Sequence, residues 1–204
     1  MTHRATRILG ILLLLVAAGL GISIAMHSHA NKATSQALML ASPAYAAGAS
    51  DLFGPIAVVL RDPRCMNCHP RDDRPRQGND RHPHSQNVVR GEDGLGFVNM
   101  RCTSCHREEN NRNSGVPGAP GWHLAPLSMG WQGLNDAELC AALKDEKRNG
   151  GKSLAALVEH VDKDKVVLWG WKPGGMRDPV PVPHDKFVAQ VKEWAGANAP
   201  CPGQ

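Results

Sequence analysis

The chain of 204 residues has little aromatic side-chain volume, with three Phe, one Tyr and five Trp. It also has little net charge, +4 in total, and the first thirty residues contribute two of these charges. A nucleic-acid-binding surface needs a basic face with stacking side chains, and neither is found here. Alternating polar and apolar residues, which predict strands, are lacking too. The composition therefore argues against nucleic-acid binding and against a sheet-based fold.

The N-terminal segment contains a continuous apolar run, Ile8–Met26, which carries no charge and follows Arg4 and Arg7. As a helix rising about 1.5 Å per residue, it approaches the ~30 Å thickness of a bilayer core. Positive residues before an apolar stretch predict export, with the positive end remaining inside. We expect residues 1–30 to be a signal peptide or an inner-membrane anchor. The following chain is then periplasmic, either free or attached through residues 8–26.

Beyond that segment, residues 31–50 are rich in Ala and Ser and are expected to form a linker. Residues 51–204 have the length of one domain. Clusters of Gly, Pro, Asn and Asp predict long loops in it. Apolar residues at helical spacing and helix-start signals predict four helices. The helices are expected from Asp51 to Leu60, from Asn135 to Gly150–Gly151, around Leu154–Val161, and from Phe187 to near Gly196. We expect a mostly α domain.

Two similar motifs stand out, "RCMNCH" at Arg64–His69 and "RCTSCH" at Arg101–His106. Each has two Cys three positions apart and a His directly after the second. Four thiolates could bind zinc, but such a site leaves both His without a role. A disulfide framework is a third reading, although it also leaves the His unexplained. Cys-X-X-Cys-His is the attachment motif of c-type haem, because thiols at this spacing reach two vinyl groups and the imidazole projects towards the iron.

The sequence therefore predicts two haem c groups, attached in an exported chain. They would also supply flat apolar volume that the few aromatic residues do not, so the apoprotein is expected to fold poorly. The expected thioether residues are Cys65, Cys68, Cys102 and Cys105, and the expected proximal iron ligands are His69 and His106.

Each iron has a sixth position, and several residues could fill it. His84 follows Cys65 by 19 residues and His123 follows Cys102 by 21, both in loops that contain Pro. His160 lies on a predicted helix next to the apolar stripe. A solvent-exposed loop or helix-edge histidine is the ordinary alternative for each. Met ligation would give a higher potential than His ligation. The candidates are His82, His84, His123, His160, His184, Met100, Met129 and Met176, with His84 favoured.

Two further features accompany the motifs. Cys140 and Cys201 lie outside them, and an even remainder of Cys in an exported chain predicts a disulfide that stabilises by about 4 kcal/mol. A basic excess surrounds the first motif. It is expected to be mostly a solvated loop, although one or two Arg could pair with buried carboxylates of a cofactor. The residues of this excess are Arg61, Arg64, Arg71, Arg74, Arg76, Arg81 and Arg90.

At its two motifs the chain resembles c-type dihaem cytochromes. The gap between the motifs, with a histidine near its middle, is similar to the small dihaem subunit of periplasmic nitrate reductase. That family uses His on both faces of each iron, which favours His84. It also places a ligand His shortly before the first motif, whereas residues 51–64 contain none. The partner of the second haem is then expected downstream, from His123, His160 or Met129.

The segment Pro117–Trp171 has no counterpart in that subunit. Here the chain is similar to uncharacterised dihaem cytochromes associated with molybdenum hydroxylases such as isoquinoline oxidoreductase. The resemblance implies electron transfer between an oxidoreductase and the respiratory chain. The alternative is a dihaem enzyme, a peroxidase or a small-anion reductase, with one open iron. Its acid–base groups would come from His82, His123, Glu108 or Glu109.

Overall fold

A computed structural model describes residues 51–203 of the chain. The expected signal peptide or anchor at 1–30 and the expected linker at 31–50 lie outside the described residues. Within residues 51–203, no helix is long and apolar enough to cross a membrane. The helices are α1 (Gly54–Leu60), α2 (Pro63–Met66), α3 (Asp136–Lys144), α4 (Leu154–Lys163), α5 (Lys165–Trp169) and α6 (His184–Gly196).

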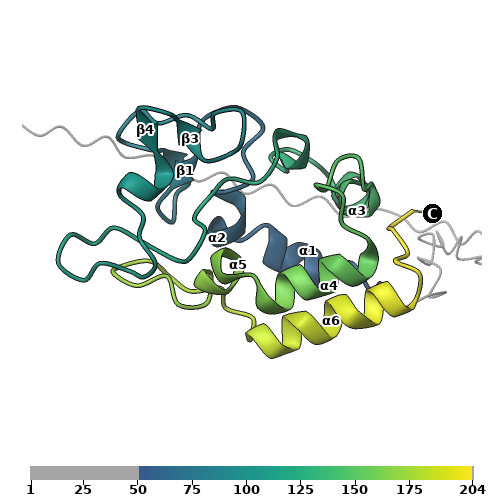
Figure 1. Ribbon diagram of the computed structural model, residues 1–204. Helices are drawn as coiled ribbons and strands as arrows, with labels where there is room; N and C mark the ends of the chain where they lie inside the picture. The colour runs from purple at the N-terminus through teal and green to yellow at the C-terminus, as the bar shows by residue number, and fades with distance from the viewer. Residues whose placement is uncertain (1–50, 204) are drawn as a thin grey trace, which may run out of the picture. The chain divides into compact units, whose positions relative to one another are not determined.

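The strands are only two residues long and form two separate hairpins. Strand β1 (Arg76–Gln77) pairs antiparallel with β2 (His82–Pro83), and β3 (Gly96–Phe97) pairs antiparallel with β4 (Met100–Arg101). Two single 3-10 turns lie at Cys102–Ser104 and Leu127–Met129. Figure 1 shows the helices gathered on one side and the loops with the short strands on the other.

Helix boundaries follow local capping. Helix α3 begins at a capping box, in which the Asn135 side chain accepts from Glu138 N–H and the Glu138 carboxylate accepts from Asn135 N–H. It ends at Lys144, six residues before Gly150, because Asp145 is extended. Helix α5 was not expected from the sequence. Asp164 starts it by accepting hydrogen bonds from the backbone N–H groups of the first turn.

The apolar core lies between α1, α3, α4 and α6. Phe53, just before α1, packs against Trp194 of α6 with ring centroids 5.7 Å apart. A disulfide joins Cys140 of α3 to Cys201 in the C-terminal tail. The tail is thereby fixed against the helical half, next to the core rather than next to the loops that carry the two motifs.

Candidate functional site

The first motif lies on α2 and the turn that follows it. Asp62 caps the helix by accepting a hydrogen bond from Arg64 N–H at 2.7 Å. The turn then continues, with Cys68 N–H donating to the carbonyl of Cys65 at 3.1 Å. Both thiols and the ring of His69 are thereby presented from one short helical segment, as attachment to a single porphyrin requires.

The His69 ring is held in one orientation by distant residues. Its Nδ1 donates a hydrogen bond of 2.9 Å to the carbonyl oxygen of Met129, sixty positions later. The ring also stacks on the indole of Trp131, with centroids 3.4 Å apart and planes inclined by 13°. The segment 129–131 therefore fixes the orientation of the imidazole through one hydrogen bond and one stacked ring.

The second motif has the same arrangement. Cys102 begins a 3-10 turn, and His106 N–H donates to its carbonyl at 2.9 Å. His106 Nδ1 donates to the carbonyl oxygen of Pro117 at 2.7 Å. Its ring stacks on Trp122 with centroids 4.5 Å apart and planes inclined by 4°. Each motif histidine is thus fixed by one carbonyl and one indole.

This anchoring decides the chemical form of both imidazoles. A ring that donates through Nδ1 to a carbonyl has the tautomer with the lone pair on Nε2, which is the ligand form for a metal. Burial lowers the pKa of His69 to about 3, although the Met129 carbonyl acts in the opposite direction. Burial likewise lowers the pKa of His106. Both rings are therefore neutral at physiological pH and available to iron.

The thiols of the first motif are buried. Burial raises the pKa of Cys65 and raises that of Cys68 to about 11, with the nearby Cys102 as the second cause. Among residues 51–203, no three His, Cys, Asp or Glu side chains gather as a metal site. The effect of Cys102 on Cys68 also indicates that the two motifs approach each other.

Two adjoining cavities surround the second motif. One, of about 360 Å³, is lined by Cys102, Cys105 and His106. The other, of about 510 Å³, shares His106 with it and extends to Arg64. Both have the size of cofactor pockets, ~300–1,000 Å³. With the anchored imidazole and two thiols, this region fits a haem.

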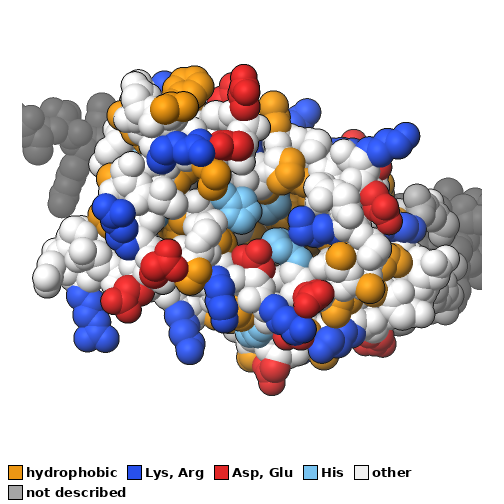
Figure 2. Space-filling model, in the orientation of Figure 1, with side chains coloured by type: hydrophobic (Ala, Val, Ile, Leu, Met, Phe, Trp, Pro, Cys, Tyr) orange, Lys and Arg blue, Asp and Glu red, His pale blue; other side chains and the backbone are white. Residues whose placement is uncertain are grey.

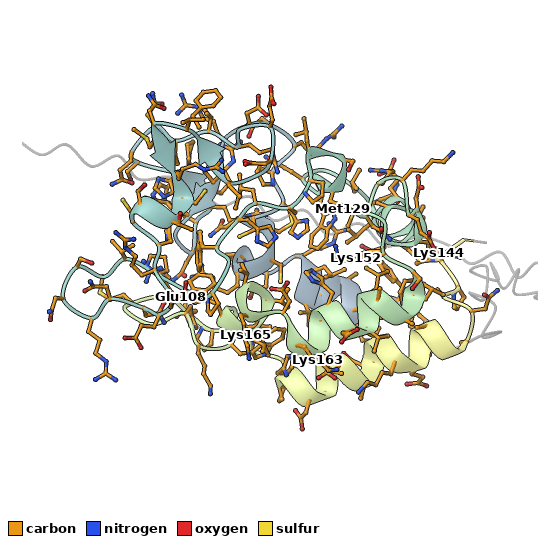
Figure 3. The ribbon with its side chains drawn as sticks, in the orientation of Figure 1. Glu108, Met129, Lys144, Lys152, Lys163 and Lys165 are labelled. Carbon is orange, nitrogen blue, oxygen red and sulfur yellow. A yellow bond between two sulfur atoms is a disulfide. The ribbon has the colours of Figure 1, made fainter. Side chains whose placement is uncertain are left out.

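The cavity at the first motif is smaller, about 130 Å³, between His69 and His160 of α4. Met129 and Lys152 also line it, and Figure 3 shows both between the loops and α4. Figure 2 shows histidine and apolar side chains around a hollow between the loop side and the helices. Its residues repeat the thiol and imidazole chemistry of the second motif, while its volume lies below the ~300–1,000 Å³ of cofactor pockets.

Two of the expected distal histidines face the two motif histidines. The His84 ring lies 6.0 Å from the His106 ring, centroid to centroid, at a steep angle of 74°. His160 lines the first cavity, and its Nδ1 is 3.3 Å from Asp164 Oδ2. That contact leaves Nε2 of His160 for a ligand.

His84 was favoured as a distal ligand without assignment to one haem, and a downstream residue was expected at the second. His84 lies beside the second motif and His160 beside the first. The β1–β2 hairpin is the physical reason. It folds back so that His84 N–H donates to the carbonyl of Pro75 at 3.0 Å, and the ring is carried across to His106.

The other candidates have different surroundings. His123 lines both the 360 Å³ and the 130 Å³ cavities, with Nδ1 donating to Gly121 at 2.6 Å. Met129 is buried behind His69 and holds it through its carbonyl. Of the remaining candidates, His82 and Met176 line the 510 Å³ cavity and Met100 lines the 360 Å³ cavity, but His82 is bonded to Asp80, Met100 is half exposed and Met176 is 98 % exposed. His184 lines none of the three cavities and is bonded to the Val161 carbonyl.

Sequence reasoning missed the residues that orient the ligands. The anchoring groups of Met129 and Pro117 are backbone carbonyls, which no side-chain pattern reveals. Asp164 follows His160 by four positions, a helical neighbour spacing that could have been noticed. Trp122 and Trp131 are two of only five Trp in the chain, and each lies in a loop after the second motif.

Each motif histidine thus has a second imidazole in its surroundings, His84 near His106 and His160 in the cavity of His69. The chain matches no protein-family model, no curated protein and no solved structure at a significant level.

Proposed function

We propose that the chain binds two haem c groups and transfers electrons in the periplasm between an oxidoreductase and the respiratory chain. The observation that supports this best is the repeated geometry of the motif histidines. His69 and His106 are each neutral, anchored through Nδ1 to a carbonyl, and supported by an indole. An anchored neutral imidazole directly after two thiols is what a c-type site requires.

Each residue has a role in this proposal. The thiols of both motifs form the thioethers, and His69 and His106 bind iron through Nε2. Asp164 orients His160 as the second ligand at the first motif, and its own pKa is lowered to about 2 chiefly by that hydrogen bond. His84 has the corresponding position at the second motif. When bound, the haem groups supply one-electron chemistry, and the chain supplies orientation and environment.

Transfer is favoured over catalysis because a second histidine is present in each cavity. A dihaem enzyme needs one iron with an exchangeable position. The closeness of Cys68 and Cys102 and the cavity residues that the two motifs share support rapid exchange between the centres. A partner oxidoreductase of the molybdenum hydroxylase type, and attachment to the inner membrane through residues 8–26, are proposed on the sequence resemblance and the leader.

The test is an absorption spectrum of the full chain, produced with the haem-attachment machinery, in both redox states and with cyanide added. The proposal predicts two haems per chain, low-spin bands in both states and no change with cyanide. A high-spin fraction that binds cyanide or peroxide would indicate the dihaem enzyme instead. A colourless product that contains zinc would contradict haem binding altogether.

A further inference from the structure

Arg64 is a buried guanidinium with three of its five N–H donors unused. Its side chain is 4 % exposed. Nη2 donates to the carbonyl of Gly78 at 2.8 Å and to Oδ1 of Asn79 at 2.9 Å. Within the described part of the chain, Nε and Nη1 have no hydrogen-bond partner. None of the carboxylates of residues 51–203 forms an ion pair with it.

An anion would stabilise such a buried and unpaired guanidinium. Arg stays protonated in proteins, and an unpaired buried charge is costly, so the cost is removed only by a negative partner. The planar fork of Nε and Nη1 matches a carboxylate. Arg90 is the useful contrast. It is equally buried and its Nε also lacks a partner, but both of its Nη atoms donate to carbonyls, those of Pro70, Asp72 and Ala125, so it serves to join backbone segments.

The region around Arg64 is basic as well as polar. Arg177 lines the same 510 Å³ cavity and donates through Nη2 to the carbonyl of Gly115 at 2.7 Å. Burial and then the charge of Arg64 lower the pKa of Arg177, so the two guanidiniums are near each other. Arg76 also lines this cavity, but Asp72 already neutralises it. Two neighbouring guanidiniums therefore face a cavity that supplies no counter-charge of its own.

The two cavities at the second motif differ in the residues that line them. Cys102 and Cys105 line the 360 Å³ cavity but not the 510 Å³ cavity, whereas Arg64, with Cys68 of the first motif, lines the 510 Å³ cavity but not the other. His106 lines both. A c-type haem has its two thioethers on one edge and its two propionate carboxylates on the opposite edge. A haem held at Cys102 and Cys105 therefore directs its carboxylates towards Arg64.

We propose that Arg64, which directly precedes the first motif, binds a propionate of the haem attached to the second motif, with Arg177 beside it. This inference rests on the proposed function. Arg64 also lines the 130 Å³ cavity of the first motif. One guanidinium thus borders both sites, where it neutralises a carboxylate of one cofactor and adds positive charge beside the other. Arg64 is accordingly a positioning residue that sets the reduction potential.

The experiment compares the holoprotein with its Arg64→Met and Arg64→Lys variants by spectroelectrochemical titration and by resonance Raman of the propionate vibrations. Arg112→Met is the matched control, because Arg112 is exposed. Removal of the positive charge favours the oxidised iron, so Arg64→Met should lower the potential of at least one haem. The expected change is about tenfold in the redox equilibrium constant, which is about 59 mV for one electron.

Arg64→Lys keeps the charge but not the fork, so it should shift the potential less while still altering the propionate vibrations. Phosphate and succinate titrations of the wild type distinguish a second source of the anion. Unchanged potentials support a propionate, and a saturable shift that is lost in Arg64→Met would overturn it in favour of a soluble anion. If Arg64→Met and Arg112→Met, each with both haems attached, had the same potentials and propionate vibrations, this inference would be overturned while the proposed function would stand. Absence of haem from the wild type would instead overturn the proposed function.

Discussion

At the scale of single residues, the site depends on hydrogen bonds that select a tautomer. An imidazole free in a loop exchanges its proton between two nitrogens, and only one of the two forms suits a ligand through Nε2. The carbonyls of Met129 and Pro117 accept hydrogen bonds from Nδ1–H and so fix this tautomer in His69 and His106. Asp164 acts similarly on His160. The three groups are invisible to a motif search, yet they determine which nitrogen is free.

Replacement of His84 by Met tests the ligand pairing at the second motif. The His84→Met variant is expected to change one of two irons from His/His to His/Met ligation and to raise its potential. Near-infrared magnetic circular dichroism should therefore lose about half of the His/His band. Lys144→Met, on an exposed residue of α3 that lines none of the three cavities, is the control and should change nothing. If the spectrum of His84→Met were unaltered, the second ligand at the second motif would be another residue, and His123 would be the next to test.

At the scale of elements, the helices were largely predictable and the loops were not. Apolar spacing predicted α4 and α6, and the Asn135–Glu138 pair predicted the start of α3, because these signals are local. The expected end of α3 at Gly150 was wrong, because Asp145 and Asn149 form a turn first. Helix α5 was missed, because five residues are too few to show a period.

The candidate site was predictable only in part, for the same reason. The motifs identify four thiols and two histidines by spacing alone. The partner of each histidine depends on how a long loop returns, and the β1–β2 hairpin decides this through tertiary contacts. The position of His84 beside His106 therefore could not be derived from the distance between residues along the chain.

Two glycines allow the loops to approach the anchoring carbonyls closely. Gly118 follows Pro117, and a Cβ there would lie 2.3 Å from the carbonyl oxygen of Glu109. Gly118→Ala is therefore expected to displace the Pro117 carbonyl and to destabilise the holoprotein by about 1–3 kcal/mol. Denaturant unfolding measures this cost, and the spectrum of the second haem reports the displaced ligand.

Gly196→Ala is the control for that substitution, since a Cβ at the end of α6 meets no atom within 4 Å. It should be neutral or stabilise by at most about 1 kcal/mol. If Gly118→Ala changed the unfolding free energy as little as Gly196→Ala, the loop would accommodate the added methyl group. The anchoring role of Pro117 would then not be supported. Gly130 follows Met129 in the same way, with its Cβ position 2.8 Å from Arg71 Cα.

At the scale of the whole described unit, a helical half supports a loop half that has little regular structure. The core between α1, α3, α4 and α6 adjoins the 130 Å³ cavity of the first motif, which Leu143 and Leu157 of the core also line, whereas loops enclose most of the 360 Å³ cavity. The loops are joined by backbone hydrogen bonds, such as that from Leu124 N–H to the carbonyl of Gly94 at 2.9 Å, and by side chains such as Arg90, which bonds three carbonyls. We therefore expect the cofactors to contribute much of the stability of the loop half.

The disulfide belongs to the helical half, and its removal should leave the haems in place. Cys140 and Cys201 close a loop of 61 residues. The double variant Cys140→Ala/Cys201→Ala is expected to lose about 4 kcal/mol of unfolding free energy on the chain-entropy account. Urea titration measures the loss, with haem content as the control. Loss of haem together with the disulfide would contradict the separation between the two halves.

The most direct test of the central claim is the intact mass of the denatured full chain, produced with the haem-attachment machinery and compared with its variants. The account predicts a mass above the polypeptide by two haem groups. Cys65→Ala/Cys68→Ala and Cys102→Ala/Cys105→Ala should each lose one group. A wild-type chain that carried one group or none after denaturation would contradict the claim that each motif attaches a haem.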